Sequence, residues 1–189
     1  LYLGIDPTFS YKKEEVIHYP VIKLIPKPIE TPRPFSYCLL TSKNSVGFLK
    51  GKVDLTKCIT IGPATSHFLR KEGIEPLIEC KVHTQEGMIE EIQKLPQESS
   101  FYYPRSSRAR PLLASFLQEK GYAFQVVDLY DTVLQKPFAP PSLEEIKEIV
   151  FTSPSTVEGF FALYTKVPKG IKVSFQGPVT EKKYNVHIT

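Results

Sequence analysis

Two short stretches decide the interpretation of this chain: LLTSKNSV at Leu39–Val46 and VFTSPSTV at Val150–Val157. A second pair follows in the same order, ITIGPAT at Ile59–Thr65 and VSFQGPVT at Val173–Thr180. Each stretch joins a short apolar run rich in β-branched residues to a turn of hydroxyl residues or Gly-Pro. The ordered recurrence of both motifs predicts duplicated strand–helix units.

The same rhythm of strand, turn and helix runs through most of the chain and predicts a parallel α/β fold. Strands are expected at residues 2–5, 16–25, 37–40, 58–61, 77–82, 101–103, 124–130, 149–151 and 171–175. Helices are expected at residues 43–49, 64–71, 85–95, 108–120 and 157–164. The final segment, NVHIT at residues 185–189, is expected to be one more strand.

Two proline-rich passages divide the chain, PKPIETPRP at Pro26–Pro34 and KPFAPPS at Lys136–Ser142. Proline fixes φ and lacks a backbone donor, so these passages predict extended linkers at about residues 26–35 and 136–141. Residues 1–25 and 142–189 then form a discontinuous domain 1, and residues 36–135 an inserted domain 2. The predicted fold is two small parallel-sheet, Rossmann-like domains joined by two extended linkers, with the active-site cleft between them.

The composition is that of an ordinary globular protein. Among 189 residues, 41% are hydrophobic, and 24 Lys and Arg against 20 Asp and Glu give a formal charge of +4. This balance argues against disorder and against a nucleic-acid binder, but it suits an anionic small molecule. No apolar run approaches the length of a membrane span, and no GxGxxG or P-loop fingerprint indicates a nucleotide site.

The cysteines and histidines predict neither a disulfide framework nor a metal site. The three cysteines, Cys38, Cys58 and Cys80, have no paired spacing and lie in strand-like runs. They are expected to be buried, reduced thiols of a cytoplasmic protein. The four histidines are scattered, without the spacing of metal ligands.

The starts of the predicted helices are candidate anion sites. Unpaired backbone N–H groups and the positive end of the helix dipole meet there, and they bind carboxylate or phosphate readily. The hydroxyls and glycines that follow the strands are Thr41, Ser42, Gly62, Thr65, Ser153, Ser155, Gly177 and Thr180. The alternative is that the hydroxyls only cap their helices.

A third candidate anion site lies in YYPRSSRARPLL, Tyr102–Leu113, where Ser106 and Ser107 precede a predicted helix and three arginines, Arg105, Arg108 and Arg110, cluster at its start. Cationic side chains at a helix N-terminus oppose the dipole unless an anion is present, which suggests a ligand. The alternative is that these arginines are solvated or paired with acidic neighbours.

The ordered set of motifs resembles the uroporphyrinogen-III synthase family over most of the chain. Besides the TS and GP motifs, the matching stretches are HYPVIKLIP (His18–Pro26), IGPATSHFLRKEGI (Ile61–Ile74), YPRSSRARPLLASFLQEKG (Tyr103–Gly121) and VVDLYDT (Val126–Thr132). The resemblance implies that the chain closes linear hydroxymethylbilane to uroporphyrinogen III, with loss of water and inversion of the last pyrrole ring. It implies no metal and no organic cofactor.

The resemblance also implies roles for particular residues. Tyr130 stands at the tyrosine of the family's VYxT motif, proposed to assist loss of the hydroxyl group; the alternative is that it only packs at a strand end. Thr41, Ser42, Thr65, Ser153 and Thr180 correspond to substrate contacts. The partner is then a small linear tetrapyrrole polycarboxylate, with no nucleic acid or membrane. We expect a monomer that transiently contacts the preceding enzyme of the pathway.

Three departures from the family qualify the resemblance. Ile5-Asp6-Pro7 stands where Thr-Arg-Pro is usual, and too few residues separate the first two expected strands for a helical crossover. The chain is also shorter than its family and begins with Leu1, so we expect that some segments are missing. A module that binds a tetrapyrrole or another polyanion without catalysis is the alternative function.

Overall fold

The computed structural model describes residues 1–7 and 15–188. The chain divides into two compact units. Unit 1 comprises Leu1–Ile25 with Thr132–Thr189, and unit 2 comprises Pro26–Asp131. The domain boundaries and linkers that the proline-rich passages suggest stay a prediction.

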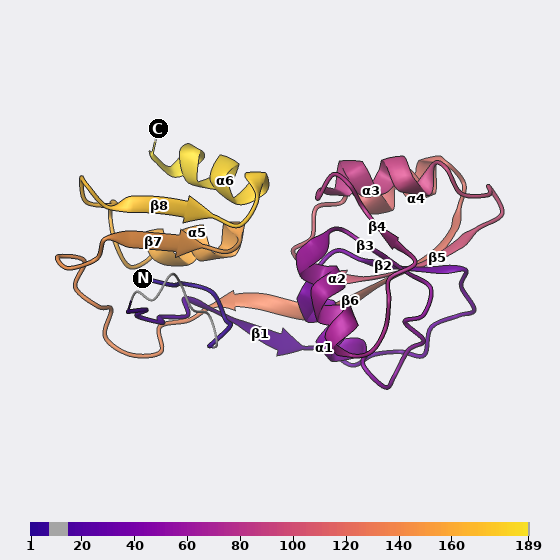
Figure 1. The fold of residues 1–189 in the computed structure, drawn as a ribbon, viewed down its shortest axis with the longest axis horizontal. Coiled ribbons are helices and arrows are strands. Elements are labelled where there is room, and N and C mark those ends of the chain that lie inside the picture. Colours follow the sequence, from indigo (N-terminus) through magenta and orange to yellow (C-terminus); the bar gives the residue numbers. More distant parts are fainter. Residues whose placement is uncertain (8–14, 189) are drawn as a thin grey trace. The chain divides into compact units, whose positions relative to one another are not determined.

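The larger sheet has six strands in the order β1-β6-β5-β2-β3-β4 (Figure 1). Its strands are β1 (Ile22–Pro26), β2 (Tyr37–Leu40), β3 (Cys58–Thr60), β4 (Ile78–Glu79), β5 (Ser100–Ser106) and β6 (Ala123–Leu134). Strands β2 to β5 lie wholly in unit 2, and the boundary between the units crosses β1 and β6. The pairs β2–β3, β2–β5, β3–β4 and β5–β6 are parallel, as the sequence predicts. The helices are α1 (Lys43–Leu49), α2 (Pro63–Lys71), α3 (Gln85–Ile92) and α4 (Leu112–Glu119).

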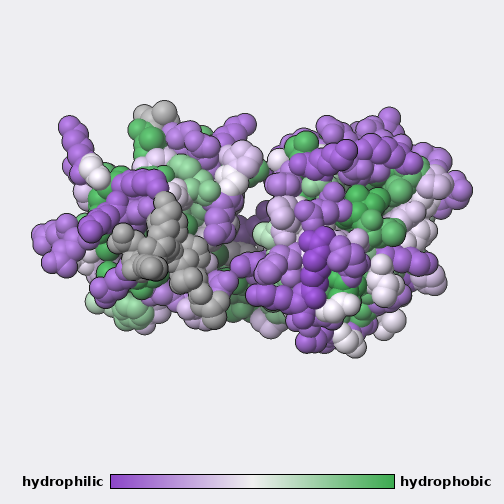
Figure 2. All heavy atoms as spheres, in the orientation of Figure 1, coloured by the Kyte–Doolittle hydropathy of each residue, from purple (hydrophilic) through white to green (hydrophobic). Residues whose placement is uncertain are grey.

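Both faces of the central strands β2 and β3 are covered, which explains why these strands are buried along their length rather than in alternation. Leu39 and Tyr103 are buried in a cluster with Met88 of α3 and Leu117 of α4. Neighbouring strand residues such as Leu40 point to the opposite face, where α1 and α2 pack on β2 and β3. The surface over α1 and α2 is mainly hydrophilic (Figure 2).

Unit 1 holds a two-stranded parallel sheet of β7 (Glu148–Phe151) and β8 (Lys172–Phe175), with helices α5 (Pro154–Phe161) and α6 (Pro178–Ile188). Its core contains Leu3, Phe151, Phe160 and Tyr184. Rings of β7, β8 and the two helices pack on one another in edge and stacked geometries, for example Phe151 on Phe160 with centroids 5.5 Å apart. The unit thus repeats the strand–helix–strand–helix order of β2, α1, β3 and α2.

One predicted element is wrong and another begins at the wrong residue, and each error has a physical reason. The sequence suggests a strand at residues 185–189, but α6 continues through Ile188, because a helix buries Thr180 and Tyr184 on one face, four residues apart. The helix expected from Arg108 begins only at Leu112, with Pro111 as its N-cap. A residue before proline disfavours the helical region, which keeps Arg110 outside the helix.

Other elements differ mainly at their ends. The strand expected at residues 2–5 is reduced to bridges from Tyr2 to His18 and to Val150, and the strand expected from residue 16 begins at Ile22. The segment between these two expected strands, which is too short for a helical crossover, includes residues 8–14, and these lie outside the described residues. No helix in the described part of the chain has the length and apolar character to cross a membrane.

Candidate functional site

The carboxyl edge of the sheet in unit 2 gathers most of the predicted site residues of that unit. Thr41 and Ser42 follow β2, and Gly62 follows β3, the parallel neighbour of β2. Arg105 and Ser106 end β5 on the other side of β2, and Ser106 lies opposite Tyr130 of β6. Ligands of open parallel α/β sheets bind at this edge, so the arrangement is suited to binding one.

Tyr130 and Ser42, which lie 88 residues apart in the sequence, are in direct contact. The Tyr130 hydroxyl donates a long hydrogen bond of 3.4 Å to Ser42 Oγ, and its ring stacks on Phe48 of α1 at 5.2 Å between centroids. Ser42 is also the N-cap of α1, where its Oγ accepts a hydrogen bond from the backbone N–H of Asn44. Tyr130 is only 3% exposed, so the ring is a packed side chain whose hydroxyl reaches a helix start.

A second tyrosine, Tyr103, lies on β5, three residues before the end of that strand. Burial raises the pKa of Tyr103, while a hydrogen bond with Thr41 and the charges of Arg105 and Arg110 oppose that rise. Gln85 Nε2 donates to the Tyr103 hydroxyl at 3.2 Å. Thr41 is therefore tied to β5 through Tyr103, just as Ser42 is tied to β6 through Tyr130.

Gly62 begins α2 as its N-cap, directly before Pro63. Its backbone is extended, so the turn itself does not require glycine. A side chain here would have to displace His83, because a Cβ at this position would lie 2.7 Å from the ring of that exposed histidine. Thr65 is buried in the first turn of α2, 3% exposed, and its backbone N–H donates to the Gly62 carbonyl. Sequence reasoning missed His83, because the contact joins loops 21 residues apart in sequence, with no motif to indicate it.

Two arginines of the third candidate site have acidic partners. Arg105 Nε donates to Asp128 Oδ1 at 2.9 Å, and Arg110 forms a forked pair with Glu86 at 2.7 and 2.9 Å. The hydrogen bonds from Arg110 lower the pKa of Glu86 to about 2. Each of these two arginines therefore already faces a carboxylate, which offsets its charge near the start of α4, so the cluster does not by itself require a bound anion.

The predicted residues of unit 1 lie at the carboxyl edge of its own sheet. Ser153 is the N-cap of α5 and forms a capping box with Thr156, and Ser155 lies in the first turn. Gly177 precedes α6 with φ +106°, a conformation that side chains rarely adopt, so glycine is required there. Thr180 is buried in the first turn of α6, 2% exposed.

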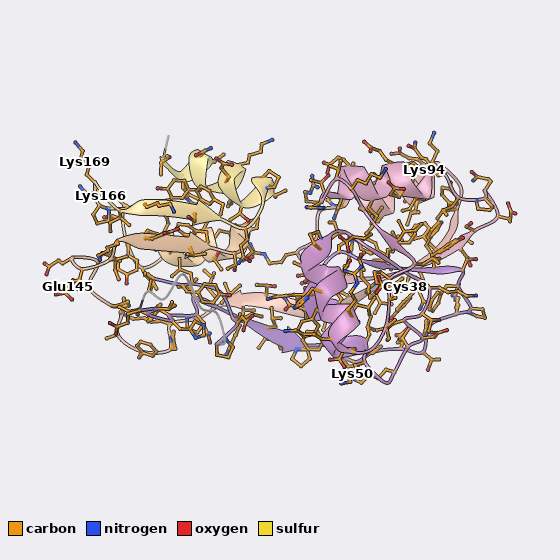
Figure 3. All side chains as sticks on the ribbon, in the orientation of Figure 1. Cys38, Lys50, Lys94, Glu145, Lys166 and Lys169 are labelled. Carbon is orange, nitrogen blue, oxygen red and sulfur yellow. The ribbon has the colours of Figure 1, made fainter. Side chains whose placement is uncertain are left out.

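The cysteines are buried thiols, and Cys38 lies inside unit 2 on β2 (Figure 3). Burial raises the pKa of Cys38 well above its usual value and that of Cys80 to about 12. Thiols held in the neutral form are poor nucleophiles and poor metal ligands. Among residues 1–7 and 15–188, no three His, Cys, Asp or Glu side chains are grouped so that they could hold a metal ion.

Parallel sheets whose carboxyl edges carry helix starts, hydroxyls and glycines define an α/β protein of the class that binds polar ligands at that edge. Within this class, the chain belongs to the uroporphyrinogen-III synthase family. A family model described as "Uroporphyrinogen-III synthase HemD" matches residues 8–187, nearly the whole chain.

Individual relatives agree with this membership. The "Porphyrin biosynthesis protein HemD" of Ruminiclostridium josui is 26% identical over 203 aligned residues, which cover 91% of this chain and 40% of that protein. The present chain therefore spans less than half the length of this curated relative.

Two solved structures share the fold. The uroporphyrinogen-III synthetase of Helicobacter pylori has a TM-score of 0.67 and 18% identity, covering 100% of this chain and 88% of that one. A mutant uroporphyrinogen III synthase of Thermus thermophilus has a TM-score of 0.59 and 19% identity, covering 92% and 80%. At these identities the likeness concerns the fold.

Proposed function

We propose that this chain closes linear hydroxymethylbilane to uroporphyrinogen III, as a lyase of tetrapyrrole biosynthesis. Family membership over residues 8–187 supports the reaction class. The observation that carries the proposal within this chain is the contact between the Tyr130 hydroxyl and Ser42 at the carboxyl edge of the sheet. It brings a proton donor to a helix start, where an anionic substrate group would bind.

The reaction requires orientation and stabilisation of charge. The C–O bond of the terminal hydroxymethyl group breaks, a new C–C bond to the last pyrrole ring forms, and water leaves with one proton from that ring. Attack at the substituted carbon of that ring would give a spiro intermediate. The bond from this carbon to the neighbouring methylene bridge would then break and form again at the unsubstituted carbon, which loses its proton, so that the ring is inverted. Tyr130 would donate a hydrogen bond to the departing oxygen, while contacts to the carboxylates hold the chain folded for closure.

The acetate and propionate groups of the substrate would bind to hydroxyls, backbone N–H groups and Arg105. In unit 2 the proposed contacts are Thr41, Ser42, Gly62, Thr65, Arg105 and Ser106. Ser153, Ser155, Gly177 and Thr180 of unit 1 would bind the same substrate, in the two-domain arrangement that the resemblance implies. We also propose that the protein acts as a monomer in the cytoplasm and meets the preceding enzyme of the pathway only transiently.

The experiment is to incubate the protein with freshly made hydroxymethylbilane, oxidise the products and separate the porphyrin isomers. We expect mainly isomer III, whereas a heat-inactivated sample should give isomer I, the product of spontaneous closure. If the native protein gives only isomer I at the spontaneous rate, the enzymatic proposal is wrong. Saturable tetrapyrrole binding in that sample would instead establish the alternative, a binding module without catalysis.

A further inference from the structure

Asp131, the residue next to Tyr130, connects three segments of unit 2. Its Oδ1 accepts a hydrogen bond of 2.5 Å from Ser107 Oγ and lies 2.8 Å from Lys27 Nζ. Lys27 follows β1, Ser107 follows β5, and Asp131 belongs to β6. One carboxylate thus contacts the residues that follow two different strands.

Backbone hydrogen bonds accompany these side-chain contacts. The Ser107 N–H donates to the Tyr130 carbonyl at 3.0 Å, and the Lys27 N–H donates to the Leu129 carbonyl at 2.8 Å. The register of β5 against β6 shifts between Arg105 and Ser106, at the place where β5 ends. A register shift changes the direction of the side chains beside it, so strand pairing alone does not fix the segment that follows, and this segment needs another contact as an anchor. Asp131 supplies that anchor through Ser107.

The charge of Asp131 suits this role. Hydrogen bonds from Lys27 and from Ser107 lower the pKa of its carboxyl, which keeps it ionised at neutral pH. Lys27 and Asp131 are 37% and 41% exposed at their side chains, and ion pairs this exposed contribute little to stability. The contacts therefore fix a local geometry more than they stabilise the fold.

We propose that Asp131 is a positioning residue, which holds the Arg105–Ser107 segment against the strand of Tyr130 so that Arg105 and Ser106 meet the substrate. The proposal rests on the proposed function. Asp131 itself does not touch the substrate and acts through Ser107. Because the segment binds carboxylates and does not take part in bond breaking, its loss should affect KM and spare kcat.

The test compares Asp131→Ala, Ser107→Ala and the double variant with the wild type in the isomer III assay. Each single variant should raise KM roughly fivefold with kcat nearly unchanged, the factor expected for one hydrogen bond between side chains. The double variant should be no worse than either single one, because both break the same contact. Ser107→Thr keeps the hydroxyl and should restore the wild-type KM.

The matched control is Glu75→Ala, which removes an exposed carboxylate paired with Arg70 at the far end of α2. It should leave KM and kcat unchanged. A wild-type KM in Asp131→Ala, or an additive loss in the double variant, would overturn the proposal.

Amide hydrogen exchange at Ser107 separates this proposal from the proposed function. Exchange should become faster in Asp131→Ala, whether or not the wild type forms isomer III. Unchanged exchange would refute the anchoring role even in an active enzyme. Faster exchange in a protein that forms no isomer III would support the anchor and refute only the enzymatic proposal.

Discussion

Tyr130→Phe separates the two roles open to this side chain, proton donor or packed ring. The substitution removes one oxygen and keeps the ring, its burial and its stacking on Phe48. The hydrogen bond that is lost, to Ser42 Oγ, is 3.4 Å long, well beyond the usual distance between hydroxyl oxygens. The free energy of unfolding should therefore change by less than about 1 kcal/mol.

Turnover should respond far more strongly. A hydrogen bond to an oxygen that gains negative charge contributes about 1.5–3 kcal/mol, more than one between neutral groups. At about 1.4 kcal/mol per factor of ten, kcat for isomer III should fall roughly 10- to 100-fold. The assay follows isomer III by chromatography after oxidation, and chemical unfolding measured on the same preparation checks stability.

Tyr37→Phe is the matched control for this prediction. Tyr37 begins β2 at the opposite end of the strand from Ser42, and its ring stacks on Phe101. It should keep wild-type turnover. If Tyr130→Phe also keeps wild-type turnover, Tyr130 has no part in the departure of the hydroxyl group and is only a packed ring.

Four further predictions concern stability and reactivity. Gly47→Ala in α1 should stabilise the protein by up to about 1 kcal/mol in urea unfolding, because a Cβ there meets nothing within 4 Å. Gly159→Ala should destabilise it by about 1–3 kcal/mol, because its Cβ would lie 2.6 Å from Val21 Cγ2; equal effects of the two would contradict this packing. Glu86→Gln should reduce the free energy of unfolding at pH 7, and reduce it less at pH 3. The pKa of Glu86 is lowered to about 2 in the folded protein, so its carboxylate stabilises the fold fully at pH values above the pKa of a carboxyl in the unfolded chain. This stabilisation is lost as the pH falls toward 2. A difference that grew on acidification would refute the Arg110 pairing. The three thiols should react with maleimide at pH 8 only after denaturation, since all are buried; rapid labelling of the folded protein would contradict this.

Most of the parallel fold could be predicted because its signals are local. Hydrophobic runs next to Ser42 and Gly62 indicate strand ends and helix starts, and the structure places an N-cap at each. The hydrophobic pattern gave the wrong element where tertiary packing decides between helix and strand. The segment around Tyr184 has β-branched neighbours and suggests a strand, yet burial of Tyr184 against Phe151 and Phe175 makes it helical.

The candidate site could be predicted only in part, because a motif names residues and not their partners. The family motif indicated Tyr130, but nothing in it revealed Phe48, which covers the ring from α1. The arginine cluster suggested an anion, whereas Arg105 and Arg110 already face acidic side chains from other segments. Asp131 occupies the variable position of its motif, so its contacts emerge only from the fold.

The two copies of the TS motif differ in a way that bears on function. In unit 1, Thr156 Oγ1 accepts hydrogen bonds from the N–H groups of Thr152 and Ser153 and donates to the Ser153 carbonyl at 2.7 Å. In this copy the Thr156 hydroxyl finds its hydrogen-bond partners within the motif, and helix capping explains why the motif carries hydroxyls. In unit 2, the corresponding hydroxyl, that of Ser45, is buried without a hydrogen-bond partner among the described residues.

A buried hydroxyl without a partner costs about 1–3 kcal/mol, so the copy in unit 2 is the less favourable one for stability. The same copy places Ser42 against the hydroxyl of Tyr130, a contact that links the helix start to β6 and that capping does not require. Local rules are broken most often where function imposes another demand. The chemical step is therefore expected at the TS motif of unit 2, beside Tyr130.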